Sequence, residues 1–354
     1  MSGRLAHITG RCGQQIWLDN LSRSLIDSGK LQAYIDQGVT GVTSNPAIFF
    51  QAISRDAAYQ EKLKAVSSMV SDPETRYEIM VLQDIQDACD LLMPVYEKSG
   101  GKAGFVSFEV SPNIANDALM TIAEAKRLWR MINRKNAMIK IPATSAGLHA
   151  IEEVIREGIH VNVTLIFSPK QLLDVQQAYI RGISRRIDAS LSVAHIVSVA
   201  SLFISRVDSL VDKLLADRAP QLQGKIAVSA AKMNYHHWLT DFLPKINELA
   251  AALPQTLLWA STGVKNPAYP DLLYVDQLLG SDTINTIPED TLIRLLSQQE
   301  DAECLLCHDL DEAQSVLKQF EVLGFDINEI GEILLKEGLI IFEEAYQKLI
   351  DLVA

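Results

Sequence analysis

Short apolar runs of strand type alternate along the chain with longer segments of helical period. Such alternation is typical of repeated strand–helix units around a parallel sheet. The runs predict strands at residues 16–19, 41–44, 105–110, 137–141, 161–167, 196–203, 256–261 and 283–286. Because about eight such units close a barrel, the pattern predicts an α/β fold, a (β/α)8 TIM barrel.

Helical periodicity is clearest in four segments between the predicted strands. A helix is expected over residues 71–99, with Asp72 as N-cap and Pro73 in the first turn, and apolar stripes mark 116–132, 170–183 and 207–215. The tail 327–353 predicts a further amphipathic helix, interrupted by Gly331 and Gly338. No segment rich in Pro, Gly or Ser divides the chain, so one domain over residues 1–354 is predicted.

Polar residues on strands that should be buried on both faces are the main indication of chemistry. Strand alternation separates Lys140 from Ile139 and Ile141 and turns it toward the barrel interior. The same alternation turns four more polar side chains inward near the carboxyl ends of their strands. They are Asp19, Glu109, Asn162 and Thr164. Barrel enzymes carry their active sites at these strand ends, so the five residues predict a catalytic centre.

A lysine beside two carboxylates suits Schiff-base chemistry with a carbonyl substrate. The lysine amine must be neutral to attack a carbonyl. Burial favours the neutral amine, whereas the two carboxylates favour the charged ammonium, so the sequence does not give the direction of the net pKa shift. Asp19 is placed to take a proton from the hydroxyl whose carbon–carbon bond breaks. Glu109 and Thr164 are placed to hold a water that moves protons during imine formation. The competing interpretation is that Lys140 pairs with a helix carboxylate at the surface.

Charge and cysteine content narrow the class of protein. With a formal net charge of −12, the chain lacks the positive surface that a nucleic-acid-binding protein needs. A local basic pocket for a small phosphorylated ligand is still compatible with this charge. The chain has four cysteines, too few and too scattered for a disulfide framework, which favours a reducing cytoplasmic location. With no leader-like segment and no long apolar run, we expect neither export nor a membrane span. The cysteine positions are Cys12, Cys89, Cys304 and Cys307.

Six ordered segments carry a family resemblance: WLDN at 17–20, GVTSNPA at 41–47, SFEV at 107–110, MIKIPAT at 138–144, NVTLIFS at 162–168 and ASTGVKNP at 260–267. Together they resemble the transaldolase family from about residue 14 to residue 288, and the tail resembles its longer bacterial members. The resemblance implies a class I aldolase-like barrel with N-terminal and C-terminal helical additions, without cofactor or metal.

The resemblance also implies residue roles. Lys140 would form the Schiff base on the fourth strand, Asp19 would be the general acid/base, and Glu109 with Thr164 would hold the catalytic water. Dihydroxyacetone contacts would come from Asn45, Asn162 and Ser201, with Phe203 beside that unit. The substrate phosphate would meet Arg206 and Lys265, with the hydroxyl donor left open between Ser261 and Thr262.

The implied reaction moves dihydroxyacetone from sedoheptulose 7-phosphate to glyceraldehyde 3-phosphate, giving erythrose 4-phosphate and fructose 6-phosphate. The partners expected are sugar phosphates, with no nucleic acid or membrane, in a monomer or homodimer. Two departures are noted: Ser111 where many relatives are acidic, and Lys265 where better-known members have arginine. Lysine lacks the bidentate fork of arginine, which predicts a looser phosphate contact.

Two alternatives stay open. One is a fructose 6-phosphate aldolase that releases free dihydroxyacetone; the chain length, Glu109, and Phe203 where those aldolases have tyrosine argue against it. The other is a non-catalytic scaffold or redox module using the CxxCH segment 304–308, which we interpret as a chance pair on a late helix. A scaffold does not need a lysine held inside its barrel.

Overall fold

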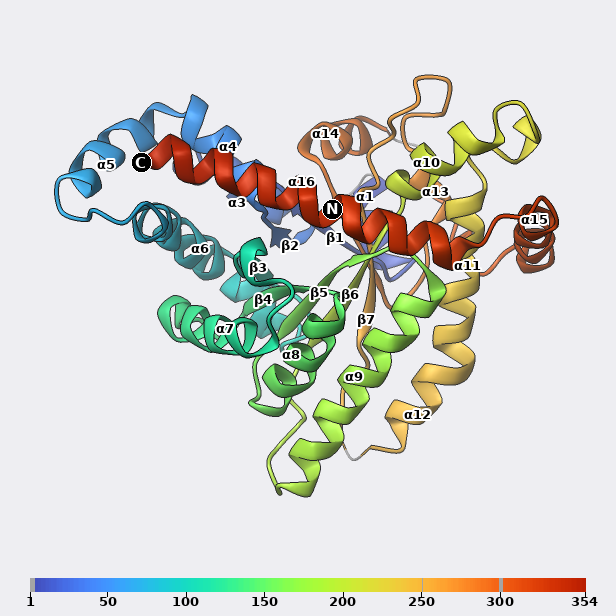
Figure 1. The fold of residues 1–354 in the computed structure, drawn as a ribbon, viewed down its shortest axis with the longest axis horizontal. Helices are drawn as coiled ribbons and strands as arrows, with labels where there is room; N and C mark the ends of the chain where they lie inside the picture. Colours follow the sequence, from blue (N-terminus) through green and yellow to red (C-terminus); the bar gives the residue numbers. More distant parts are fainter. Residues whose placement is uncertain (1–3, 250, 299–301) are drawn as a thin grey trace.

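A computed structural model describes residues 4–249, 251–298 and 302–354 of the chain. Eight parallel strands follow one another in order and close into a barrel (Figure 1). The strands are β1 (Gln15–Asp19), β2 (Val39–Thr43), β3 (Phe105–Glu109), β4 (Ala137–Pro142), β5 (Val161–Ile166), β6 (Ser198–Phe203), β7 (Thr256–Ala260) and β8 (Thr283–Ile287). Pairing of β1 with β8, Gln15 opposite Ile284, completes the closure. The predicted (β/α)8 fold is therefore confirmed.

Two predicted strand starts differ from the observed ones by two residues. β2 begins earlier than expected because Val39 pairs with Ile16 of β1. β6 begins later than expected, since the amide of Ile196 donates a 3.1 Å hydrogen bond to the carbonyl of Val193 and so belongs to a turn. Neither change alters which side chains face the barrel interior.

Helices surround the barrel and extend it at both ends. They are α1 (Arg4–Gly10), α2 (Arg23–Asp27), α3 (Lys30–Gln37), α4 (Pro46–Arg55), α5 (Ala57–Ser67), α6 (Pro73–Lys98), α7 (Ala118–Ile132), α8 (Ser145–Arg156), α9 (Pro169–Asp188), α10 (Ser205–Leu215), α11 (Ile226–His237), α12 (Leu243–Asn247), α13 (Leu273–Gln277), α14 (Glu289–Ser297), α15 (Leu310–Val322) and α16 (Ile327–Val353), with short helices η1 (Pro112–Ile114), η2 (Pro220–Leu222) and η3 (Trp238–Phe242). The predicted cap of α6 is confirmed, because the Asp72 side chain accepts from the amide of Thr75.

The core lies inside the barrel and between the strands and the helices. Every residue of β4, β5 and β6 is buried, polar ones included. Large apolar side chains such as Trp17 and Trp259 fill the remaining space. Since buried polar groups require partners, the polar residues of these strands need hydrogen bonds from the protein or from ordered water.

Helix α16 crosses the barrel and packs against α4, α6, α9, α10 and the end of β5. In Figure 1 it is the long red helix lying over the strands. The predicted interruption at its glycines is wrong, since the helix is continuous. A Cβ added at Gly331 would lie 2.6 Å from Cβ of Ser168, and one at Gly338 would lie 3.0 Å from Cδ2 of Leu165. The two glycines therefore allow helix α16 to pack closely against the barrel.

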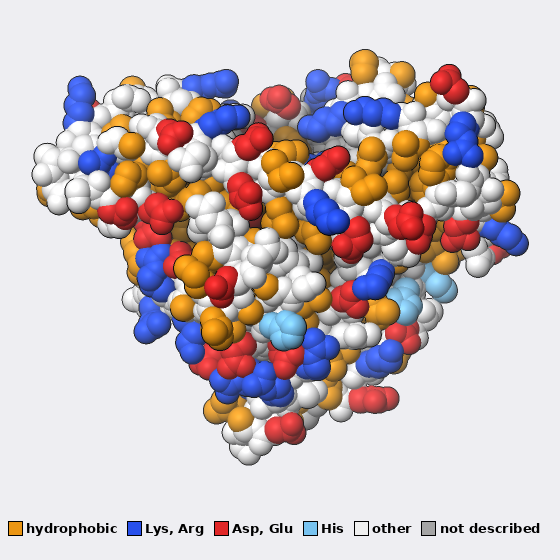
Figure 2. All heavy atoms as spheres, in the orientation of Figure 1, with side chains coloured by type: hydrophobic (Ala, Val, Ile, Leu, Met, Phe, Trp, Pro, Cys, Tyr) orange, Lys and Arg blue, Asp and Glu red, His pale blue; other side chains and the backbone are white. Residues whose placement is uncertain are grey.

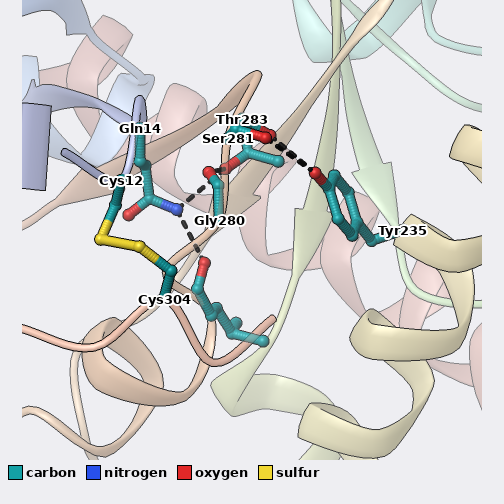
Figure 3. The surroundings of a disulfide bond; sticks show 8 residues. Cys12, Gln14, Tyr235, Gly280, Ser281, Thr283 and Cys304 are labelled. Atoms are coloured by element: carbon teal, nitrogen blue, oxygen red, sulfur yellow. Dashed lines mark hydrogen bonds between the residues drawn. A yellow bond between two sulfur atoms is a disulfide. The ribbon is translucent and has the colours of Figure 1, made fainter. Parts of the chain in front are cut away.

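The cysteines correct a second expectation. Cys12 and Cys304 form a disulfide across a sequence separation of 292 residues (Figure 3). Beside it, the side-chain amide of Gln14 donates hydrogen bonds to the carbonyl of Leu278, at 2.7 Å, and to the hydroxyl of Thr283, at 2.9 Å. Composition did not predict the pairing because only the closed barrel brings the N-terminal segment beside the segment that follows α14. Cys304 lies in that loop, not on the late helix expected.

The surface carries charges of both signs. Figure 2 shows lysine and arginine interspersed with aspartate and glutamate over the face in view, with apolar side chains between them. Within the described ranges, no helix has the length and apolar character needed to cross a membrane.

Candidate active site

A cavity of about 140 Å³ opens at the carboxyl ends of the barrel strands. It brings together most of the residues that the sequence singled out, from four of the strands, from the loops after β2 and β7, and from the start of α10. The predicted residues that line it are Asp19, Asn45, Lys140, Thr164, Ser201, Phe203, Arg206, Ser261 and Lys265. Glu109 and Asn162 do not line this cavity but contact residues that do.

Lys140 lies in the middle of this group and is only 5% exposed. Its Nζ is 3.4 Å from Oε2 of Glu109 and donates to the backbone carbonyl of Ser44, also at 3.4 Å. The register of β3 and β4 sets Glu109 directly beside Lys140, which explains the ion pair. The alternative of a surface lysine paired with a helix carboxylate is therefore wrong.

Asp19 ends β1 and is held by a chain of hydroxyl groups. Thr43 donates to Oδ1 of Asp19 at 2.6 Å, and the hydroxyls of Thr43 and Thr286 are 2.7 Å apart. A hydroxyl has one proton, so Thr286 is the donor to Thr43 when Thr43 donates to Asp19. Burial raises the pKa of Asp19 above its ordinary value, and Lys140 with Thr43 opposes that rise.

Glu109 and Thr164 both carry oxygen atoms without a hydrogen-bond partner among the described residues, Oε2 of the former and Oγ1 of the latter. Burial raises the pKa of Glu109, while Lys140 opposes the rise. A cavity of about 20 Å³ borders Glu109, and Thr164 lines the larger pocket. Buried oxygens without a hydrogen-bond partner in the protein are commonly satisfied by ordered water.

A second hydrogen-bonded chain runs through Asn162. Ser201 donates to Oδ1 of Asn162 at 2.7 Å, and Nδ2 of Asn162 donates to the hydroxyl of Ser107 at 3.0 Å. These bonds fix the orientation of the amide, which is fully buried and contacts the pocket through Ser201. Asn45 is fixed differently: its Oδ1 accepts from the amide of Ile48 as the N-cap of α4, which leaves its NH2 group for the pocket.

The outer wall of the pocket is basic. Arg206 is half-buried with its Cζ 5.6 Å from the centre of the Phe203 ring, and burial lowers the pKa of the guanidinium. Lys265 is exposed at the rim. Of the two hydroxyl residues left open by the sequence, Ser261 lines the pocket, whereas Thr262 is buried and donates to Oδ1 of Asn285 at 2.7 Å.

Sequence reasoning missed two kinds of pocket residue. Thr43 is the last residue of β2 and Thr286 the last but one of β8, and the alternation test used for Lys140 could have found both. Phe342 comes from α16 and lines the pocket over Lys140, but no local pattern says which helix crosses a barrel. Within the described ranges, no three His, Cys, Asp or Glu side chains gather as they would around a metal ion.

Comparison with known proteins identifies the protein family of this chain. The model of the family described as "Transaldolase/Fructose-6-phosphate aldolase" matches residues 16–353, which is nearly the whole chain. The chain belongs to this family. A transaldolase of Neisseria gonorrhoeae is 50% identical to it over 341 residues, covering 96% of each protein. Transaldolases of Thiobacillus denitrificans and Trichodesmium erythraeum are 45% and 39% identical, each over 96% of this chain.

Family membership confirms the resemblance inferred from the six sequence segments. As a member of the transaldolase family the chain is an enzyme of the transferase class, and the interpretation as a non-catalytic scaffold is set aside. The match reaches residue 353 and so includes α16, the helix that carries Phe342.

Proposed function

We propose that this enzyme transfers a dihydroxyacetone unit from sedoheptulose 7-phosphate to glyceraldehyde 3-phosphate through a Schiff base on Lys140. The observation that carries the proposal is the buried Lys140 amine, 3.4 Å from the Glu109 carboxylate and inside a pocket that also holds Asp19. Carboxylates near the amine can accept and return the protons that imine formation moves.

The first half-reaction begins when Nζ of Lys140 attacks the ketone carbon of the donor. A water held by Glu109 and Thr164 carries protons while hydroxide leaves as water and the iminium forms. Asp19 then takes the proton from the donor hydroxyl two carbons from the iminium carbon. The bond between that hydroxyl-bearing carbon and the carbon next to the iminium carbon breaks, its electron pair moves toward the iminium to give an enamine, and an aldose leaves.

The second half-reaction runs the same steps in reverse with a new aldehyde. The enamine carbon attacks the acceptor carbonyl, Asp19 returns its proton to the new alkoxide, and hydrolysis of the iminium frees the product. Asn45, Asn162 and Ser201 would hold the hydroxyls of the three-carbon unit between the two halves. Arg206, Lys265 and Ser261 would hold the terminal phosphate of donor and acceptor.

Fructose 6-phosphate aldolase is the second candidate, because the family description covers both activities. The two differ in whether dihydroxyacetone is handed on or released. Phe203 favours transfer, since it lines the pocket with a ring that has no hydroxyl group to hold a water.

Reductive trapping tests the proposal. Incubation with fructose 6-phosphate and borohydride should fix a three- or six-carbon adduct on the peptide that contains Lys140, read by mass spectrometry. Lys140→Met should remove both adduct and turnover and leave unfolding unchanged, whereas Asp19→Ala should keep the adduct and lose most cleavage. An adduct on another residue, or none in the wild-type enzyme, contradicts the assignment.

Three further expectations stay predictions. We propose that the chain works as one domain, in a cytoplasmic location, as a monomer or homodimer. The closed barrel with α16 packed on it supports a single unit. Sugar-phosphate substrates support the location, although the Cys12–Cys304 bond is unusual for a reducing compartment.

A further inference from the structure

Helix α16 contributes one aromatic side chain to the pocket, and its position over the reactive amine is specific. The Phe342 ring centre is 5.8 Å from Nζ of Lys140, and the side chain is 8% exposed. It is also one of the residues that line the 140 Å³ cavity. Phe342 therefore covers the Lys140 amine on the side where α16 crosses the barrel, and it separates the amine from solvent there.

The placement of this ring is fixed by the rest of α16. Gly338 precedes Phe342 by one helical turn and lies against Leu165, the residue next to Thr164. Leu165 has a φ of 60°, in the left-handed region that leucine rarely adopts, at the point where the pairing of β5 with β6 is irregular. One turn after Phe342, Tyr346 packs edge to face on Tyr77 with ring centres 6.0 Å apart. The ring is thus held between two packed contacts.

We propose that Phe342 is a positioning residue of the transfer reaction: its ring stabilises the cationic nitrogen on Lys140 and keeps water away from the enamine until an aldehyde arrives. A cation within about 6 Å of an aromatic face is attracted by it, more strongly where water is excluded. The same face attracts the iminium, because the positive charge stays on that nitrogen. This inference rests on the proposed Schiff base at Lys140.

The competing step shows what the ring would prevent. Release requires that the enamine carbon take a proton, giving the iminium of dihydroxyacetone. A water then adds to the iminium carbon, the carbon–nitrogen bond breaks, and the nitrogen leaves as the lysine amine with the electron pair of that bond. The net change consumes one water and produces free dihydroxyacetone. Without the ring, water reaches both carbons from the α16 side, so release competes with transfer.

The test uses Phe342→Leu, which keeps apolar volume and removes the ring. Leu349→Ala is the matched control, because Leu349 is fully buried on the same helix but does not line the pocket. Each variant is given fructose 6-phosphate with and without erythrose 4-phosphate, and free dihydroxyacetone is measured against transfer product. Unfolding curves of each variant accompany the assay.

For Phe342→Leu we expect the release-to-transfer ratio to rise by about tenfold and kcat for transfer to fall by a similar factor, with KM for the acceptor nearly unchanged. Leu349→Ala should keep the wild-type ratio. A wild-type ratio in folded Phe342→Leu, or an equal rise in Leu349→Ala, overturns the inference. Absence of any borohydride adduct at Lys140 in the wild-type enzyme would instead overturn the proposed function.

Discussion

The hydroxyl of Thr43 donates a 2.6 Å hydrogen bond to the carboxylate of Asp19, from the neighbouring strand. The bond favours the ionised carboxylate against burial, which raises the pKa of Asp19. Because Thr286 in turn donates to Thr43, the pocket holds a relay of two hydroxyls that ends on the proposed general base. The hydrogen bond therefore offsets part of the effect of burial on the Asp19 carboxylate.

Thr43→Val should move the acid limb of the pH–kcat profile to higher pH. Removal of the donor raises the pKa of Asp19 further, and Asp19 must be ionised to accept a proton, so activity is lost first at low pH and recovers as the pH rises. Thr43→Ser, which restores a donor, should return the limb to its wild-type position. If the acid limb of Thr43→Val stays at its wild-type position, ionisation of Asp19 does not control the rate-limiting proton transfer.

Arg206→Ala and Lys265→Ala should each raise KM for sugar phosphates by roughly tenfold or more, since a charge-assisted contact contributes about 1.5–3 kcal/mol. Turnover of non-phosphorylated fructose should hardly change. Lys265→Arg adds a bidentate fork and should lower KM below the wild-type value. Lys245→Ala, at a surface ion pair with Asp241, serves as a control for loss of positive charge. Equal losses on phosphorylated and free substrates would refute a phosphate site.

Phe203→Tyr should raise release of free dihydroxyacetone relative to transfer. The new phenol can orient a water for protonation of the enamine, beside the position that Ser201 shares on the same face of β6. Product analysis with erythrose 4-phosphate as acceptor measures the ratio. Phe203→Leu is the control, because it changes the ring without adding a hydroxyl. An unchanged ratio in a folded tyrosine variant means that water access is set elsewhere.

Cys12→Ser should reduce the free energy of unfolding by about 2–4 kcal/mol and leave kcat unchanged. The bond constrains the unfolded chain over a separation of 292 residues, and neither cysteine lines the pocket. Urea unfolding with and without reductant measures the effect. Cys307→Ser, which removes an exposed free thiol, should be neutral. If reductant destabilises Cys12→Ser as much as the wild-type enzyme, the stabilisation comes from another source.

Strand residues were predictable because a strand has a period of two and a barrel has a defined inside. A lysine between two isoleucines has one direction available, so alternation alone assigns Lys140, Asp19 and Glu109 to the interior. Thr43 and Thr286 obey the same rule. They were missed because threonine is common in strands and does not by itself indicate chemistry.

Contacts between distant segments were not predictable in this way. The period of α16 identifies an apolar face, but nothing local determines that this face covers the mouth of the barrel and sets Phe342 over Lys140. Gly331 and Gly338 suggested breaks in a helix, whereas close packing against Ser168 and Leu165 is what they permit. The Cys12–Cys304 pair likewise depends on closure of the whole barrel.

The Cys12–Cys304 bond also changes what a single cut in the backbone can do. All eight strands and all the proposed catalytic residues lie between the two cysteines, inside one covalent loop. A protease that nicks any one connection within that loop leaves both fragments joined, so they separate only when a reductant is added. Helix α16 lies outside the loop. A cut between Cys304 and Ile327 would instead detach the segment that carries Phe342. The disulfide thus keeps a cut barrel covalently joined but does not hold α16 to it.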